Sequence, residues 1–275
     1  MGVIEINNLT RDYGKGKGVF GVSFSLERGE AFGFLGPNGA GKTTAIRHLM
    51  GFLRPKGGSC TIDGLDCFKH RAQIQRTLGY ISGELNYFED MTGTEYLKFI
   101  MRYRGEKSDG RMNELLERFE LDPGSNIAKM SKGTKQKIGI VAAFMHDPEL
   151  LILDEPSSGL DPLMQNRFVE LINEEKAKGK TILMSSHKFD EVERTCHRIG
   201  IIREGKIVAV DQTDAMRKKY VKEYTVTLDT PELATAFARD FDGKQNETTP
   251  LSVTVTTKHS LEEVFMQYYR GGVNV

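Results

Sequence analysis

The loop from Gly36 to Thr44 constrains the fold of this chain more than any other stretch. Its residues fit the pattern G-x-x-x-x-G-K-[ST] and are Gly36, Pro37, Asn38, Gly39, Ala40, Gly41, Lys42, Thr43 and Thr44. The apolar run Ala31–Leu35 before it is typical of a buried parallel strand, and the apolar spacing of Ala45–Met50 after it predicts a helix. Strand, glycine-rich loop and helix together are the context in which this pattern forms a phosphate-binding loop. The sequence therefore predicts an α/β chain that binds a nucleoside triphosphate.

Each part of this loop has a physical role in binding phosphate. Glycine lets the backbone approach a polyphosphate closely and turn successive N–H groups toward it. The N-terminus of the following helix adds unpaired donors and a partial positive charge. Lys42 is expected to reach the β- and γ-phosphates, and the Thr43 hydroxyl is placed to ligate Mg2+. The alternative is a glycine-rich turn that binds nothing, and the flanking strand and helix count against it.

The composition narrows the class of protein. The chain has 275 residues, of which 39% are hydrophobic and 28% charged, as expected for a globular protein with an ordinary core. Lys+Arg and Asp+Glu both number 38, and this neutral balance disfavours a nucleic-acid binder that relies on bulk electrostatics. No apolar run approaches the roughly 20 residues needed to cross a bilayer. Cys60, Cys67 and Cys196 lack C-x-x-C spacing, so we expect reduced thiols in a cytosolic protein rather than a metal site.

Hydrophobic patterning predicts an α/β core with additions at three places. Alternating runs at Val3–Ile6 and Val22–Leu26 predict an N-terminal antiparallel β layer. Between about residues 85 and 146 the apolar spacing predicts helices, which we expect to form an insertion into the core. We expect residues 1–215 to form the main domain and residues 216–275 a small α+β appendage. The other expected elements are helices at 68–76, 162–178, 232–240 and 261–269, strands at 78–81, 181–185, 224–228 and 251–255, and a hairpin of 199–203 with 206–210.

Two carboxylates follow the most apolar strand of the predicted core. Leu150–Leu153 is continuously apolar, as in a central strand covered on both faces. Asp154 and Glu155 then emerge at its C-terminal end, where ligands bind in open α/β sheets. Such a pair is commonplace at a solvated strand end, but in a chain with a phosphate loop it suggests a role for each residue. Asp154 would hold Mg2+ and Glu155 would polarise an attacking water.

The order of these motifs resembles that of the nucleotide-binding subunits of ABC transporters, over roughly Val3 to Asp211. This resemblance implies a P-loop NTPase core of the RecA-like type. The motifs that carry it are the Walker A loop at Gly36–Thr44, the Walker B strand with its catalytic glutamate at Leu150–Glu155, the ABC signature at Met130–Lys137, the D-loop at Ser158–Asp161 and the switch histidine at His187.

The resemblance implies that the functional unit is a dimer. Two such domains pack head to tail around two ATP molecules, and each ATP with its Mg2+ lies between the phosphate loop of one subunit and the signature of the other. The signature residues here are Ser131, Lys132, Gly133 and Thr134. A simpler interpretation is that Ser131 only caps the helix that follows it. Tyr13 falls where the family has an aromatic residue that stacks on the base, whereas an aromatic on a loop is otherwise usually a hydrophobic plug.

Two residues depart from the family pattern. Lys132 stands where the usual signature has glycine, and it adds positive charge without preventing ATP binding. Gly83 stands where the Q-loop usually has a glutamine that contacts Mg2+ and water and links to the membrane partner. Glu84 is adjacent and is a candidate substitute for that glutamine. The departure at Gly83 therefore concerns coupling to the membrane partner more than the ATP site.

The closest resemblance is to single-domain ATPase subunits of bacterial export systems of the ABC-2-like type, including antibiotic and multidrug exporters. It implies an ATPase in a homodimer or paired with a second ATPase subunit, bound at the inner face of the cell membrane to a separate transmembrane permease. One alternative is a soluble ABC-type ATPase without transport, and the single phosphate loop and the absence of long heptads count against it. The other is a regulatory ATP switch, which Gly83 favours and which Glu155 and His187 oppose.

Overall fold

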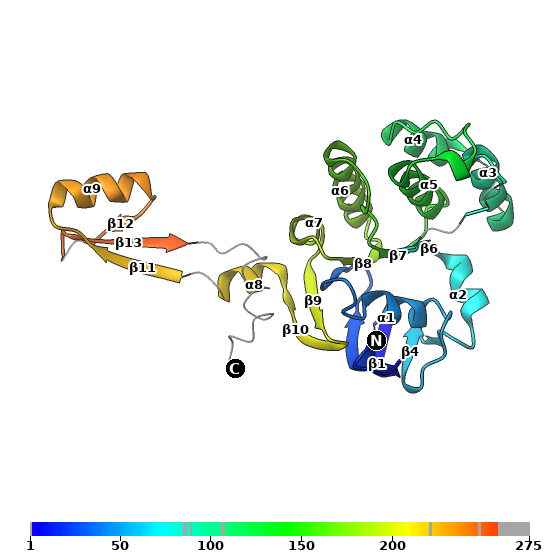
Figure 1. Cartoon of the computed structure of the whole chain (residues 1–275), viewed down its shortest axis with the longest axis horizontal. Coiled ribbons are helices and arrows are strands. Elements are labelled where there is room, and N and C mark those ends of the chain that lie inside the picture. Colours follow the sequence, from blue (N-terminus) through cyan, green and yellow to red (C-terminus); the bar gives the residue numbers. More distant parts are fainter. Residues whose placement is uncertain are drawn as a thin grey trace. The chain divides into compact units, whose positions relative to one another are not determined.

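The computed structural model describes residues 2–257 apart from 85–86, 89, 106–107, 220–221 and 247–248. The chain divides into two compact units, Met1–Val210 and Asp211–Val275 (Figure 1). The helix predicted at 261–269 lies outside the described residues. The boundary predicted after residue 215 falls inside a short helix, α8 (Thr213–Lys219), which the sequence pattern did not predict.

A six-stranded sheet forms the centre of the first unit. Its strand order is β10-β9-β3-β8-β7-β6, and the pairs β9–β3, β3–β8, β8–β7 and β7–β6 are parallel. β3, β7 and β8 are buried along their whole length, which explains their continuous apolar sequences. The bounds are β3 Ala31–Leu35, β6 Leu78–Ile81, β7 Leu150–Asp154, β8 Thr181–Ser186, β9 Arg198–Arg203 and β10 Lys206–Gln212.

A second, antiparallel sheet confirms the predicted N-terminal β layer. Its order is β2-β1-β4-β5, with bounds β1 Ile4–Asp12, β2 Gly18–Leu26, β4 Gly57–Ile62 and β5 Leu65–Asp66. Alternate residues of β1 and β2 are buried and join the core of β3 and the phosphate-loop helix, for example Ile4, Leu9 and Phe24. Phe24 stacks on Phe32 of β3 with ring centroids 5.1 Å apart. This packing holds the phosphate loop between two sheets.

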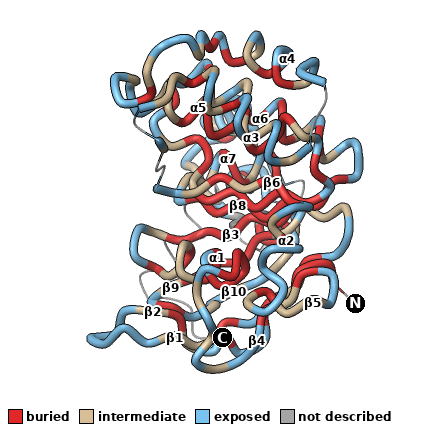
Figure 2. Tube along the Cα trace, turned by 90° about the vertical axis from the view of Figure 1, so that its right-hand side faces the viewer, coloured by how far each residue is buried: buried red, intermediate tan, exposed pale blue. Residues whose placement is uncertain are grey.

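The helices of the insertion lie at one end of the first unit. Figure 2 shows the buried strands in the middle of the first unit, with α3, α4 and α5 on the side opposite the antiparallel layer. The bounds are α1 Lys42–Leu49, α2 Arg71–Thr77, α3 Gly93–Arg104, α4 Gly110–Arg118, the short 3-10 helix Ile127–Lys129, α5 Lys132–Phe144, α6 Pro162–Ala177 and α7 Phe189–Thr195. Helices α3 to α5 form the predicted insertion. None of the helices in the described part of the chain is long and apolar enough to span a bilayer.

The helix predicted at residues 68–76 begins later, at Arg71. The reason is Asp66, whose Oδ1 accepts hydrogen bonds from the backbone N–H groups of Phe68 and Lys69 at 3.0 and 2.8 Å. This side chain gives the backbone a local turn in place of the first helical turn. α7 was not predicted at all, since its seven residues are too short for a clear apolar period.

The described part of the second unit contains α8 and a three-stranded antiparallel sheet with a further helix, α9 (Pro231–Asp240), packed on it. The strand order is β11-β13-β12, with bounds β11 Lys222–Thr227, β12 Lys244–Gln245 and β13 Ser252–Thr257. Helix α9 is capped by Thr230, the residue before it, whose side chain accepts a hydrogen bond from Leu233 N. The predicted strands and the predicted helix at 232–240 are therefore confirmed where the structure describes them.

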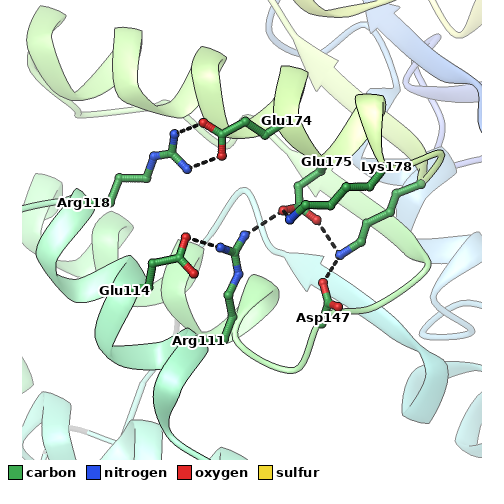
Figure 3. A network of polar contacts seen from close by, with 8 residues as sticks. Arg111, Glu114, Arg118, Asp147, Glu174, Glu175 and Lys178 are labelled. Atoms are coloured by element: carbon green, nitrogen blue, oxygen red, sulfur yellow. Dashed lines mark hydrogen bonds and ion pairs between the residues drawn. The ribbon is translucent and has the colours of Figure 1, made fainter.

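Ion pairs join helix α4 of the insertion to helix α6 of the core (Figure 3). Glu175 on α6 is completely buried and accepts from Arg111 of α4 at 2.6 Å. Lys178 and Lys180 also pair with Glu175, and Lys180 pairs with Asp147 as well. Burial acts to raise the pKa of Glu175, but the hydrogen bonds from Lys180 and Lys178 outweigh it, so this pKa lies below its ordinary value.

We expect Glu175→Gln to lower the free energy of unfolding by about 3 kcal/mol at pH 7, because it leaves buried cations without their shared carboxylate. A carboxyl with a lowered pKa stabilises the fold above its ordinary pKa of 4.5, and that stabilisation is lost as the pH falls through the folded value. The difference between wild type and Glu175→Gln should therefore shrink below about pH 4.5. Urea unfolding at several pH values measures it, and an unchanged midpoint at pH 7 would contradict the prediction.

Candidate active site

A cavity of about 340 Å3 lies against the phosphate loop. Pro37, Asn38, Gly39, Gly41, Lys42, Thr43 and Thr44 line one side of it, and the rest is lined by Tyr13, Lys17, Gly18 and Glu155. These residues come from the β1–β2 connection, from the loop after β3 and from the end of β7. The structure therefore brings the predicted phosphate loop, the aromatic residue and one of the two predicted carboxylates to a single site.

The phosphate loop leads directly into α1 without a side-chain cap. The N-cap residue is Gly41, whose backbone is left-handed with φ 111°, and no side chain accepts from the first turn. A side chain at this position would be strained, because only glycine adopts such a conformation freely. The first N–H groups of α1 therefore remain as donors at the cavity wall, where they can bind an anion.

Glu155, in the cavity wall beside Lys42, also contacts His187, which is not among the residues that line the cavity. Lys42 Nζ lies 3.0 Å from Glu155 Oε1, and His187 Nδ1 lies 2.6 Å from Glu155 Oε2. Lys42 also donates to the carbonyl oxygens of Gly36 and Pro37, and its side chain is only 5% exposed. Glu155 thus shares its two oxygens between a buried ammonium and an imidazole. The arrangement places a carboxylate base directly beside the phosphate loop.

The backbone at Glu155 is left-handed, with φ 51°. This conformation is uncommon for a residue other than glycine, asparagine or aspartate. It is held by the Glu155 N–H, which donates to Ser185 O at 3.1 Å and to Ser185 Oγ at 3.2 Å. The turn aims the carboxylate away from the strand direction and toward Lys42 and His187.

Asp154 ends β7 and is completely buried. Its Oδ1 accepts a hydrogen bond from Ser185 Oγ on β8, the residue in register with it. Burial raises the pKa of Asp154, and this outweighs the lowering by the hydroxyls of Ser185 and Thr43. Its Oδ2 is buried and has no hydrogen-bond partner among the described residues. A buried carboxylate oxygen beside a threonine hydroxyl is a donor set that fits Mg2+.

Gly83, after β6, approaches Asp154 closely. A Cβ added at Gly83 would lie 2.9 Å from Asp154 Oδ2, so any side chain in this backbone conformation would require a shift. Glu84 points elsewhere and pairs with Arg47 of α1 at 3.3 Å, with its side chain 77% exposed. In this structure Glu84 does not occupy the place of the missing glutamine.

Tyr13 is about half exposed, at 52%, and lines the cavity. It follows β1 directly, and the guanidinium of Arg11 lies 5.4 Å from its ring centroid. An exposed ring at a cavity wall is not a buried hydrophobic plug. Its position fits stacking on a flat ligand group.

The predicted signature residues are outside the cavity of their own subunit. Ser131 is the N-cap of α5 and accepts from Thr134 N at 3.1 Å, so it caps the helix. Lys132 is exposed and its aliphatic stem packs on Gly159, while Gly133 is so close to Gly159 that an added Cβ would lie 2.6 Å from its carbonyl oxygen. None of residues 131–134 lines the cavity.

Asp161, the predicted D-loop residue, is the N-cap of α6. Its side chain accepts from Met164 N at 3.0 Å, and this hydrogen bond is the main reason that the pKa of Asp161 lies below its ordinary value. The residue is exposed and lies outside the cavity.

Two residues of the site, Ser185 and Lys17, were not predicted from the sequence. Ser185 bonds both Asp154 and the Glu155 N–H, and the signal available was a hydroxyl near the C-terminal end of a buried strand, directly before Ser186 and His187. Lys17 lines the cavity beside Tyr13, and it could have been found as a basic residue in the same glycine-rich connection.

Comparison with known proteins gives consistent matches. The ABC transporter family matches residues 19–158 of this chain. The linearmycin resistance ATP-binding protein LnrL of Bacillus subtilis (strain 168) is 38% identical over 213 residues, which cover 76% of this chain and 68% of LnrL. The bacitracin transport ATP-binding protein BcrA of Bacillus licheniformis is 37% identical over 220 residues, which cover 79% of this chain and 72% of BcrA.

A solved structure shows the same fold. The ATP-binding subunit of an ABC transporter is 34% identical and superposes with a TM-score of 0.71. The match covers 79% of this chain and 93% of that chain.

Proposed function

This chain belongs to the ABC transporter family, and on that premise we propose that it hydrolyses ATP to power export through a separate membrane subunit. The observation that carries this proposal is that Glu155, in the wall of the phosphate-loop cavity, contacts both Lys42 and His187. A base thus lies within hydrogen-bonding distance of a phosphate-binding cation and of an imidazole. A site that only bound nucleotide would not need the base.

ATP binding follows from the walls of the cavity. The ring of Tyr13 would stack on the adenine, and the loop N–H groups and Lys42 would hold the β- and γ-phosphates. A bound γ-phosphate would compete with Glu155 for the Lys42 ammonium and leave the carboxylate facing the attacking water. Glu155 would then accept the proton of that water, and His187 would contact the γ-phosphate. Lys42 would stabilise the charge that develops on the phosphate oxygens.

Mg2+ would be held by the Thr43 hydroxyl and, directly or through water, by Asp154. When bound, this ion neutralises phosphate charge during the transfer. The supporting observation is the buried, unpartnered Oδ2 of Asp154. Because Gly83 has no side chain, it supplies no ligand, and the loop after β6 would contact the site only through its backbone.

ABC ATP-binding subunits work as dimers, and the position of the signature supports a dimer here. Ser131 and Thr134 stand at the N-terminus of α5, a helix of 13 residues, but do not line the cavity of their own subunit. They would complete the ATP site of a second copy or of a paired ATPase subunit. Lys132 would bring an additional positive charge to that shared site.

The membrane partner and the direction of transport are inferred from relatives. LnrL is a linearmycin resistance protein and BcrA is a bacitracin transport protein, so export of an antibiotic or a related compound is the function proposed here. The subunit would lie on the cytoplasmic face of the membrane, bound to its permease. The substrate would be selected by that permease.

The direct test is ATP hydrolysis by the purified chain with and without its membrane partner. We expect Mg2+-dependent phosphate release that rises when the hydrophobic protein encoded beside it is co-reconstituted in vesicles. Co-purification of the two proteins through a tag on this chain would show the assembly. ATP binding without hydrolysis in both conditions would instead favour a regulatory ATP switch. Hydrolysis that the membrane protein does not raise, with no co-purification of the two proteins, would favour a soluble ATPase.

A further inference from the structure

A buried carboxylate outside the ATP cavity contacts both segments that carry the proposed catalytic pair. Glu191 lies on α7 and is 7% exposed. Its Oε2 accepts a hydrogen bond from Ser186 Oγ at 2.8 Å. Burial raises the pKa of Glu191, and the nearby hydroxyls of Ser157 and Ser186 act against this rise. Ser186 and Ser157 are themselves buried, at 0% and 4% exposure. None of these three residues lines the cavity.

The two serines lie in the two segments of the chain that carry His187 and Glu155. Ser186 ends β8 and directly precedes His187, whereas Ser157 follows Glu155 by two residues in the turn after β7. Glu191 therefore bonds the side chain next to His187 and lies near Ser157, which is close in the chain to Glu155, the residue 2.6 Å from His187. The two segments diverge after their paired strands, because the last β7–β8 register pair is Asp154 with Ser185. Beyond that pair, the polar cluster around Glu191 connects them.

Lys188 completes the cluster. Its N–H donates to Ser186 Oγ at 3.0 Å, and its ammonium donates to Ser157 Oγ at 3.4 Å. Both serine hydroxyls thus accept from Lys188, and the hydroxyl of Ser186 donates to Glu191. The lysine charge also offsets part of the cost of burying the carboxylate.

A carboxylate is an expensive residue to bury if packing is its only task. α7 already packs through Val192, which is fully buried and so close to Gly33 of β3 that a Cβ added there would lie 2.2 Å from it. What the carboxylate adds is a directional hydrogen bond to Ser186 and a negative charge near Lys188, whose ammonium bonds Ser157. Loss of the carboxylate would leave the Ser186 donor buried without an acceptor.

We propose that Glu191 is a positioning residue that holds the Glu155 and His187 segments together, so that the two side chains meet in the geometry needed for hydrolysis. This rests on the proposed function of the ATP site. Glu191 acts through Ser186 and Lys188, which reaches Ser157, and it touches neither substrate nor the reacting atoms.

The test compares two substitutions of Glu191 with a control on the same helix. Glu191→Met keeps the length of the side chain and removes the acceptor, whereas Glu191→Gln keeps one acceptor oxygen. Asp190→Asn removes the neighbouring exposed charge without touching the cluster. For each variant we would measure kcat and KM for ATP, the Kd of a non-hydrolysable ATP analogue, and Tm.

The expected result is a split between catalysis and binding. Glu191→Met should lower kcat by about a hundredfold, the size expected from a misplacement of about 1 Å, with the Kd of the analogue changed less than about twofold. Glu191→Gln should recover most of that loss, and Asp190→Asn should behave as wild type. Unchanged kcat in Glu191→Met would overturn the proposal. So would equal losses in kcat, Kd and Tm for both substitutions, since that pattern marks a purely structural residue.

A second measurement separates this proposal from the proposed function. The imidazole NMR signal of His187, assigned with His187→Asn, should move in Glu191→Met and remain in place in Asp190→Asn. Absence of hydrolysis in the wild-type chain with its partner would contradict the ATPase function. A shifted His187 signal would still support the positioning role in that case, and an unmoved signal would overturn it.

Discussion

Replacing Glu155 by glutamine is expected to lower kcat for ATP hydrolysis by about two to four orders of magnitude while ATP binding is retained. The amide keeps the size of the side chain and can still accept from His187 or Lys42, but it cannot accept the proton of the attacking water. The ammonium of Lys42, 3.0 Å from Glu155 Oε1, stays in the cavity and remains available to the phosphates. The variant should also accumulate as an ATP-bound dimer, because the step that releases the partner subunit is slowed.

Single-turnover phosphate release, calorimetric titration with ATP, and size-exclusion chromatography with ATP would measure the three parts of this prediction. Glu204→Gln is a matched control, because Glu204 has the same left-handed backbone, with φ 48°, but its side chain is 79% exposed on the β9–β10 turn. Hydrolysis at the wild-type rate in Glu155→Gln would remove Glu155 from the catalytic role.

Replacing Lys42 by alanine is expected to abolish measurable ATP binding, a loss of at least about a hundredfold in Kd. The ammonium is the buried cation of the cavity wall, and its removal leaves a polyphosphate facing the Glu155 carboxylate without compensation. The loop carbonyls of Gly36 and Pro37 would also lose their donor. The fold should survive, because α1 and β3 remain packed in the core.

Calorimetric titration with ATP and Mg2+ is the measurement, with thermal unfolding as the check on the fold. Lys206→Ala is the control, since Lys206 is an exposed lysine on β10 outside the phosphate-loop cavity. Binding of ATP to Lys42→Ala with wild-type affinity would mean that the N–H groups of the loop and α1 bind the phosphates without the lysine.

The elements that the sequence predicted well are those with a strong local pattern. Continuous apolar runs identified β3, β7 and β8, and glycine-rich context identified the phosphate loop. Helix α7 was missed, because its seven residues show no apolar periodicity clear enough to distinguish a helix from a loop. The start of α2 was placed too early, because the competing side-chain bonds of Asp66 cannot be seen in a hydrophobic pattern.

The contacts of the site depended on long-range geometry that spacing alone does not provide. Glu155 and His187 are far apart in sequence, and their meeting follows from the parallel pairing of β7 with β8 and from the left-handed turn at Glu155. Resemblance supplied their roles, but not the 2.6 Å contact between them. The resemblance had implied that the signature residues act on the ATP of the other subunit, and none of them lines the cavity of its own subunit.

The ion pairs between α4 and α6 differ in their exposure to solvent, so salt should weaken them to different degrees. Arg111, in the first turn of α4, pairs with the fully buried Glu175, whereas Arg118, the last residue of α4, pairs with Glu174, whose side chain is 48% exposed. Dissolved ions screen exposed pairs far more than buried ones. Rising ionic strength should therefore weaken the Arg118–Glu174 pair before the Arg111–Glu175 pair. The salt concentration of the medium would then change the contact between α4 and α6 at one end while leaving the other end in place.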